Sequence, residues 1–386
     1  MPTQVRLFQL FAFVSRLELW EPVYVLFLLA RGFSLAQYGL LDTMWYVGSV
    51  LFEVPTGALA DRLGNRASLL LALVSQALSF ALIAMARSFW AMAAAFLLWG
   101  LASAFETGTY SAFLYDSLKE AGREGDYGVV YGRTASLQIL ASALGALIGG
   151  YLGAMRLQAP LWASSAIPLL LCPLVWSFRE PKVERAVERT YGQQISESVR
   201  YVWQRPLVTS LLFYCATMGA VLWALRIFYQ PLLDSYGVPV PRIGALYLGF
   251  KLCMAAGAQV SAAAVQRLGA NALYVAPALL VVAVLGLGGI VSPWAIGFIF
   301  VIFFVEGLYT PALNTWLNRS IPSGKRATII SLAMWVSCLM STAVNTPLGW
   351  IGDRFSVRAA FAAIGVGTLL CLGVIVARLR REVSAA

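Results

Sequence analysis

Long apolar runs dominate this chain and limit what it can fold into. A helix needs about 20 apolar residues to cross the hydrocarbon core of a bilayer, and it must satisfy its backbone hydrogen bonds internally. Twelve such runs, separated by polar breaks, predict an all-α polytopic membrane protein. They fall at about residues 8–30, 36–59, 67–86, 89–115, 134–154, 160–178, 206–233, 242–265, 272–291, 294–317, 327–351 and 359–378.

The composition excludes most other classes of protein. Hydrophobic residues make up 60% of the 386 residues and charged residues only 12%, against about 25% charged residues in soluble domains. The 5 cysteines are scattered singly through apolar runs, and the chain has 0 histidines. This spacing favours neither a disulfide framework nor a metal site. The sequence also contains no Walker-type nucleotide-binding loop, so ATP-driven transport by this chain is not expected.

One long polar break divides the runs into two sets of six. Residues 179–205 interleave basic and acidic side chains, a pattern typical of a surface helix and linker. We therefore expect a six-helix bundle at 1–178, a cytoplasmic linker at 179–205 and a second six-helix bundle at 206–386. Weak echoes between the sets predict a pseudo-two-fold repeat. They pair Gly108–Leu114 with Gly307–Leu313, Arg133–Leu137 with Arg326–Leu332, and the polar segment after the second run with Gln266–Asn271.

The distribution of basic residues predicts the orientation. If the N-terminus is inside, the cytoplasmic face carries 19 of the 28 lysines and arginines, and the opposite face carries 6. Because cytoplasmic loops are enriched in these residues, we expect a multi-pass protein of the inner cell membrane with both termini in the cytoplasm. The net charge of +10 then reflects topology and does not indicate nucleic-acid binding.

The segment Gly57–Arg66 is a charged, glycine-flanked turn between the second and third runs. It resembles the loop signature of the major facilitator superfamily, although Asn65 stands where that family usually has a basic residue. The matching residues that we assign to gating are Gly57, Asp61, Arg62, Gly64 and Arg66.

The resemblance implies two six-helix halves that work by alternating access of the rocker-switch type. It also implies that Asp61 bridges to the other half. The expected partner is an arginine or a helix N-terminus near Arg326. Glu53, which we expect to end the second helix beside the turn, is interpreted as a gating or helix-packing residue.

Charged residues inside the predicted spans are costly and therefore mark candidate sites. In the first run, Glu18 and Glu21 are expected to share a helical face while Arg16 points elsewhere. Two neighbouring carboxylates in a low-dielectric cavity cannot both ionise cheaply, so one could take up a proton. The alternative is an ion pair between Arg16 and the glutamates that only ties helices together.

Further candidates lie in the later runs. Glu106 and Glu306 occupy nearly equivalent places in the fourth and tenth runs. Glu106 could bind a proton or a cation, or make only a helix–helix contact. Arg226 and Lys251 could neutralise a carboxylate of the other half or hold an anionic substrate group, and Arg226 could instead snorkel outward.

The fifth run carries small residues that allow close helix packing, chiefly Gly145, Gly149 and Gly150. The run resembles an antiporter motif of the superfamily, but with Ala146 where the family has proline. The fourth run lacks the arginine that family drug exporters often carry. Both departures weaken the expectation of a standard drug/proton antiport mechanism.

These features together predict a secondary transporter, with proton-coupled efflux of a small organic or amphipathic compound as the leading hypothesis. The alternative is uptake of a metabolite or an organic anion. A membrane enzyme would need clustered catalytic groups, which the sequence does not show, and a receptor would not need so many intramembrane carboxylates. We expect a monomer in the lipid bilayer, with a small-molecule substrate and protons as coupling ion, and with no enzymatic activity, metal, cofactor or nucleic-acid partner.

Overall fold

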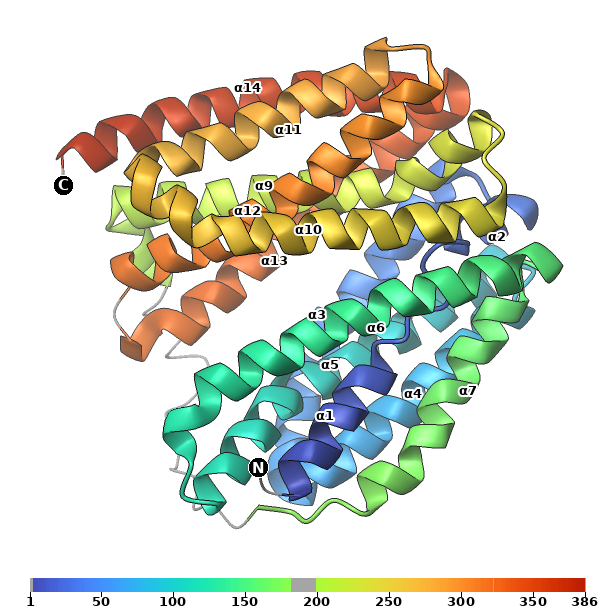
Figure 1. Cartoon of the computed structure of the whole chain (residues 1–386), viewed down its shortest axis with the longest axis vertical. Helices are drawn as coiled ribbons and strands as arrows, with labels where there is room; N and C mark the ends of the chain where they lie inside the picture. The colour runs from blue at the N-terminus through green and yellow to red at the C-terminus, as the bar shows by residue number, and fades with distance from the viewer. Residues whose placement is uncertain (1–2, 182–198, 322, 386) are drawn as a thin grey trace. The chain divides into compact units, whose positions relative to one another are not determined.

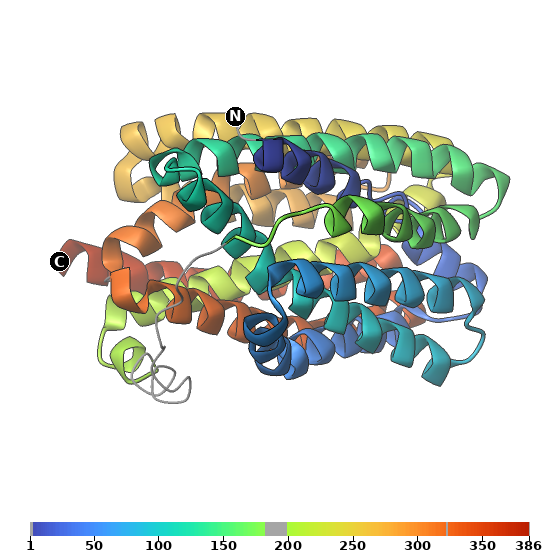
Figure 2. The same cartoon turned by 90° about the horizontal axis from the view of Figure 1, so that it is seen from below.

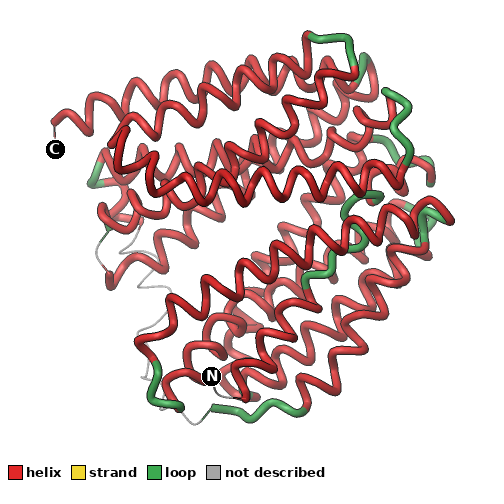
Figure 3. Tube along the Cα trace, viewed as in Figure 1, coloured by secondary structure: helices red, strands yellow, loops and turns green. Residues whose placement is uncertain are grey.

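The computed structural model describes residues 3–181, 199–321 and 323–385. Within these ranges every regular element is a helix, and loops and turns join the helices, as Figures 1 and 3 show. Nine helices of the described part are long and apolar enough to cross a membrane. The prediction of an all-α polytopic membrane protein is confirmed.

The helices follow the predicted runs closely. The first six runs contain α1 (Thr3–Ser15), α2 (Tyr24–Ala30), α3 (Leu35–Leu63), α4 (Asn65–Met85), α5 (Phe89–Glu120), α6 (Tyr127–Met155) and α7 (Ala159–Trp176). The last six contain α9 (Pro206–Ser235), α10 (Val240–Leu268), α11 (Ala272–Gly289), α12 (Ile296–Ser320), α13 (Ser323–Arg354) and α14 (Val357–Ala385). Short 3₁₀ turns, η1 (Glu124–Asp126), η2 (Gly269–Asn271) and η3 (Pro293–Ala295), precede α6, α11 and α12.

The chain forms two compact units. Unit 1 comprises Met1–Phe33, Leu40–Arg185 and Val238–Leu248, and unit 2 comprises Ser34–Gly39, Ala186–Gly237 and Gly249–Ala386. The predicted boundaries at 178 and 205 stay a prediction, because most of the expected linker, residues 182–198, lies outside the described residues.

Helix pairs build the core of each unit. In unit 1, α4 packs against α5 and α7, and α1 packs against α6 and α7, which Figures 1 and 2 show from two sides. Aromatic side chains fill the space beside α1, where the ring centroids of Phe8 and Phe113 are 5.5 Å apart. In unit 2, α9 packs against α13 and α14, and α11 packs against α12 and α14.

The first run is not one helix, so the expectation that Glu18 and Glu21 share a helical face is wrong. Helix α1 ends at Ser15, α2 begins at Tyr24, and residues 16–23 form turns between them. Pro22 lies in this segment, and proline removes a backbone donor and disfavours helical geometry in the residue before it. We call residues 16–23 the helix break.

The charged turn at Gly57–Arg66 is also shorter than expected. Helix α3 continues through Glu53 and Asp61 to Leu63, and only Gly64 separates it from α4. Gly64 has a φ of 88°, a left-handed conformation that glycine adopts without strain. The predicted motif is therefore the end of one helix, a glycine and the start of the next.

Candidate functional site

Three charged side chains of unit 1 meet where α1 ends. Arg16 Nη2 donates a hydrogen bond to Glu106 Oε1 on α5 at 2.9 Å, and Arg16 Nη1 lies 3.7 Å from Glu18 Oε1. The second oxygen of Glu18 accepts a hydrogen bond from the Ser142 hydroxyl on α6 at 2.7 Å. We call Arg16, Glu18 and Glu106 the unit 1 triad; its formal charge is negative, because two carboxylates face one guanidinium.

The helix break explains this geometry. Residues two apart on a continuous helix do not face each other, and Arg16 was accordingly expected to point away from the glutamates. That expectation is wrong, because the chain leaves the helix at Arg16 and brings its side chain beside Glu18. The structure contains an ion pair between Arg16 and Glu18, and the functional role of both residues stays a prediction.

Glu21 is more deeply buried than the residues of the unit 1 triad. It is 7% exposed, and one of its oxygens accepts a hydrogen bond from the Tyr247 hydroxyl at 2.8 Å. Its neighbours in sequence, Trp20 and Tyr24, belong to an aromatic cluster around Trp99, with ring centroids 4.9 and 6.1 Å from that of Trp99.

Unit 2 holds a second arginine–glutamate pair. Arg226 Nη2 on α9 donates to Glu306 Oε1 on α12 at 2.6 Å, and the side chains are 27% and 14% exposed. This carboxylate belongs to the same unit as Arg226, and the arginine does not snorkel away from it. Neutralisation of a carboxylate of the other half by Arg226 stays a prediction. The two side chains line a cavity of about 10 Å³ with Tyr229, Phe303 and Phe361. This is room for about one water molecule.

The two pairs occupy equivalent places in the two sets of runs. Each joins an arginine of the first run of its set to a glutamate of the fourth run. A tyrosine follows each glutamate by one helical turn, Tyr110 after Glu106 and Tyr309 after Glu306. In unit 1, Glu18 adds a second carboxylate beside the arginine. The echo around Gly108 and Gly307 was the sequence signal for this correspondence.

The expected packing glycines of α6 lie against the helix break and against α10. A Cβ at Gly145 would lie 2.6 Å from the Glu18 nitrogen, and one at Gly149 would overlap the Leu19 carbonyl oxygen. A Cβ at Gly150 would lie 3.0 Å from Gly244 Cα. Each of these glycines therefore lies at a close backbone contact, and their role as a packing motif stays a prediction.

Glu180 supports the start of α4 and is a residue to which sequence reasoning gave no role. Its carboxylate accepts hydrogen bonds from the backbone nitrogens of Asn65 at 2.6 Å and Arg66 at 2.9 Å. A Cβ at Gly64 would lie 2.8 Å from the Glu180 carboxyl carbon, so a larger residue here would displace the Glu180 side chain, while the φ of 88° itself favours glycine. Arg66 is one of the two arginines of the motif. Its guanidinium lies 5.3 Å from the ring centroid of Trp176 at the end of α7.

The remaining gating residues are on the surface of the described structure. Asp61, Arg62 and Gly57 are exposed at the end of α3. The expected partner of Asp61 near Arg326 stays a prediction, because the side chain of Arg326 lies outside the described residues. Lys251 is 8% exposed on α10, and its role as an anion ligand also stays a prediction.

A carboxylate also accepts hydrogen bonds from the start of α3, as that of Glu180 does at the start of α4, and no sequence pattern had indicated it. Asp353, at the end of α13, accepts hydrogen bonds from the backbone nitrogens of Leu35 at 2.8 Å and Ala36 at 2.9 Å. All three residues belong to unit 2. Close approach is possible because a Cβ at Gly349 would lie 2.5 Å from the Leu35 carbonyl carbon. Pairing between segments this far apart in sequence leaves no local signal.

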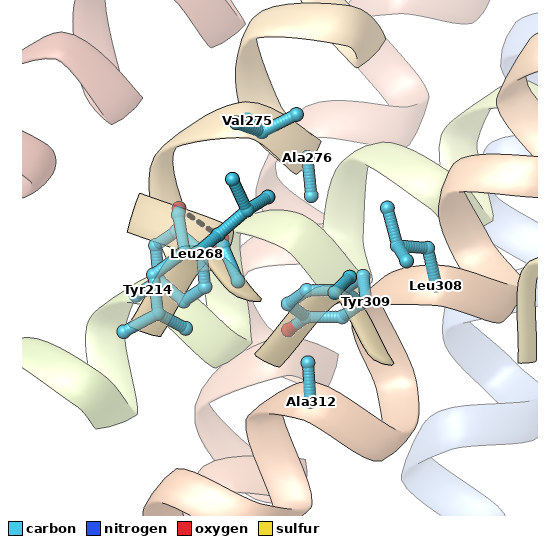
Figure 4. Close-up of a pocket in the computed structure, with 10 residues that line it drawn as sticks. Tyr214, Leu268, Val275, Ala276, Leu308, Tyr309 and Ala312 are labelled. Carbon is cyan, nitrogen blue, oxygen red and sulfur yellow. Dashed lines mark hydrogen bonds between the residues drawn. The ribbon is translucent and has the colours of Figure 1, made fainter. Parts of the chain in front are cut away.

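A further cavity of unit 2 lies between α9, α10, α11 and α12 (Figure 4). Tyr214 and Tyr309 line it, and their hydroxyls donate to backbone oxygens of Leu273 at 2.7 Å and Cys215 at 3.3 Å. The volume is about 20 Å³, whereas sites for small organic molecules measure about 300–1,000 Å³. In this structure the cavity is therefore too small for such a molecule.

Comparison with known proteins agrees with the fold. The family model described as Major Facilitator Superfamily matches residues 11–345. The chain is 21% identical to an uncharacterized MFS-type transporter, YxaM, of Bacillus subtilis (strain 168), over 91% of this chain and 90% of that one.

Two solved structures are similar to it throughout. One is the nucleoside transporter NupG, with a TM-score of 0.83, 12% identity and coverage of 98% of this chain and 99% of that one. The other is a D-xylose-proton symporter, with a TM-score of 0.71, 13% identity and coverage of 96% and 97%. The chain therefore belongs to the major facilitator superfamily, a family of multi-pass membrane proteins whose fold is that of secondary transporters and not of enzymes.

Proposed function

We propose that this chain is a proton-coupled secondary transporter that exports a small, amphipathic organic compound by alternating access. The observation that carries the proposal is the unit 1 triad, in which Arg16 faces both Glu106 and Glu18. One bound proton makes this cluster neutral. Because charge is costly in a low-dielectric interior, proton binding and conformational change are coupled there.

Glu18 is the proposed proton carrier of the triad. Its distance of 3.7 Å from the guanidinium is longer than the 2.9 Å of Glu106, so Glu106 keeps the stronger charge-assisted bond. Glu18 also contacts the Ser142 hydroxyl at 2.7 Å. A hydroxyl can donate to a carboxylate and accept from a carboxylic acid, so this contact survives in both protonation states.

Glu21 and the aromatic residues near it in sequence support an organic cation as the substrate. Glu21 is buried in unit 1, and Trp20 and Tyr24 belong to an aromatic cluster. Aromatic faces attract cations and also bury apolar groups. Uptake of a metabolite or an organic anion is the alternative, with Arg226 or Lys251 as the anion ligand. We further propose the inner cell membrane as the location, both termini in the cytoplasm and a monomer as the working unit.

Substrate-dependent proton flux in proteoliposomes tests the coupling. The purified chain is reconstituted with a fluorescent amphipathic cation inside, and flux is compared for wild type, Glu18→Gln and Glu120→Gln. Glu120 is an exposed glutamate at the end of α5 and serves as the matched control. We expect wild type and Glu120→Gln to drive uphill transport with a pH gradient, and Glu18→Gln to retain only downhill exchange.

Uphill transport by Glu18→Gln at the wild-type rate would overturn the proposed role of the triad. The direction is tested in cells that express the chain. Export predicts lower accumulation of the cation than in cells with an empty vector, and higher accumulation would establish uptake instead.

A further inference from the structure

The tyrosines that follow Glu106 and Glu306 differ between the two units in how their hydroxyls are bound. In unit 2, Tyr309 is 6% exposed, and its hydroxyl donates to the Cys215 backbone oxygen at 3.3 Å. In unit 1, the Tyr110 hydroxyl is also buried, but within the described part of the chain no group hydrogen-bonds it at normal geometry. A buried polar group without a partner is costly and rare in folded proteins. The environment of Tyr110 is therefore unusual, and that of Tyr309 is ordinary.

The Tyr110 side chain lies beside the unit 1 triad. It interacts electrostatically with Arg16 and Glu106, and Gln138 of α6 lies within reach of its hydroxyl. Packing against α1 fixes the ring, whose centroid is 4.7 Å from that of Phe8. An unsatisfied donor is thus held next to the ion pair of Arg16 and Glu106. Among the described residues, the charged and titratable groups that act on this cluster are Arg16 and Glu18 from the helix break, Glu106 and Tyr110 from α5, and Tyr131 from α6.

Proton release from Glu18 leaves two carboxylates facing one guanidinium. Arg16 is then shared between Glu18 and Glu106, whose oxygens lie 3.7 and 2.9 Å from its nitrogens in this structure. A second donor to Glu106 relieves this competition, because a charge-assisted hydrogen bond stabilises an ionised carboxylate. A tyrosine hydroxyl can donate in this way without carrying a charge of its own.

We propose that Tyr110 is a positioning residue of the unit 1 triad, whose hydroxyl donates to Glu106 when Glu18 is ionised and so allows Arg16 to turn toward Glu18. The inference rests on the proposed function, in which Glu18 carries the proton. While Glu18 is protonated, Arg16 stays on Glu106 and the hydroxyl remains beside Gln138. The hydroxyl therefore stabilises the ionised state of the triad, and its removal raises the pH at which Glu18 is half protonated.

The pH profile of carboxyl labelling tests this inference without a substrate. A hydrophobic carbodiimide reacts with the protonated form of a carboxyl group, and mass spectrometry locates the adduct on Glu18 of the full chain. Tyr110→Phe keeps the ring and its packing but removes the donor. We expect it to raise the midpoint of Glu18 labelling by about 1 pH unit, a tenfold rise in proton affinity. Tyr309→Phe makes the same change at the corresponding residue of unit 2 and leaves the midpoint unchanged.

A double variant shows whether the hydroxyl acts through Glu106. In the Glu106→Gln background, Tyr110→Phe should shift the midpoint much less, because the effects of interacting residues are not additive. An unchanged midpoint in Tyr110→Phe, or the same upward shift with and without Glu106, would overturn the inference and leave the proposed function intact. If labelling of Glu18 in the wild type does not depend on pH, both the inference and the proposed role of Glu18 as proton carrier are wrong.

Discussion

Substitution of Gly149 by alanine gives the sharpest test of how the helix break is held. The added Cβ would overlap the Leu19 carbonyl oxygen and lie 2.7 Å from the Leu19 carbonyl carbon. Ordinary contact between carbon atoms needs about 3.5 Å. The obstacle is backbone, which has no rotamer to change, so residues 16–23 or α6 must move by about 1 Å.

The expected size of the effect follows from two opposing contributions. Alanine favours a helix over glycine by about 0.8–1.0 kcal/mol, and overpacking in a well-packed interior costs about 1–3 kcal/mol. Because backbone opposes backbone here, we take the upper end of that range, which leaves Gly149→Ala destabilised by about 2 kcal/mol. Gly132, exposed on the same helix with open space around its Cβ position, is the control; Gly132→Ala should gain up to about 1 kcal/mol.

Thermal unfolding of the purified variants in detergent, followed by size-exclusion chromatography, measures the difference. The Gly132→Ala protein is expected to melt at or above the wild-type temperature and Gly149→Ala clearly below it. If Gly149→Ala is as stable as Gly132→Ala, then close backbone contact with α6 does not hold the helix break.

Three further substitutions test individual contacts. Asp353→Ala leaves two backbone donors at the start of α3 uncapped and should cost about 1–2 kcal/mol, seen as a lower unfolding temperature; no change would show that water replaces the cap. Glu180→Ala should cost about 1 kcal/mol at the start of α4 by the same reasoning and the same measurement. Arg226→Ala leaves Glu306, 14% exposed, without its ion-pair partner and should cost about 3 kcal/mol, whereas Arg226→Met with Glu306→Leu should recover most of the loss. Equal stability of the single and double variants would contradict this reading of the pair.

The hydropathy pattern was sufficient to predict the elements and the family. Segments that must satisfy every backbone group without water have to be helices, so the positions of the apolar runs determine where helices α3 to α7 and α9 to α14 lie. The short motif from Gly57 to Arg66 then indicated the superfamily that the family model confirms. The sequence also showed which charged residues lie within the apolar runs, but it did not indicate which residues they contact.

Tertiary structure alone decided those partners and the break in the first run. Arg16 and Glu106 are 90 residues apart in sequence, Arg226 and Glu306 are 80 apart, and Asp353 caps a helix that begins 318 residues earlier. A helical wheel describes one helix at a time and assumes that the helix continues. At residues 16–23 the chain leaves the helix where the glycines of α6 admit its backbone, and this change of path places Arg16 between two carboxylates.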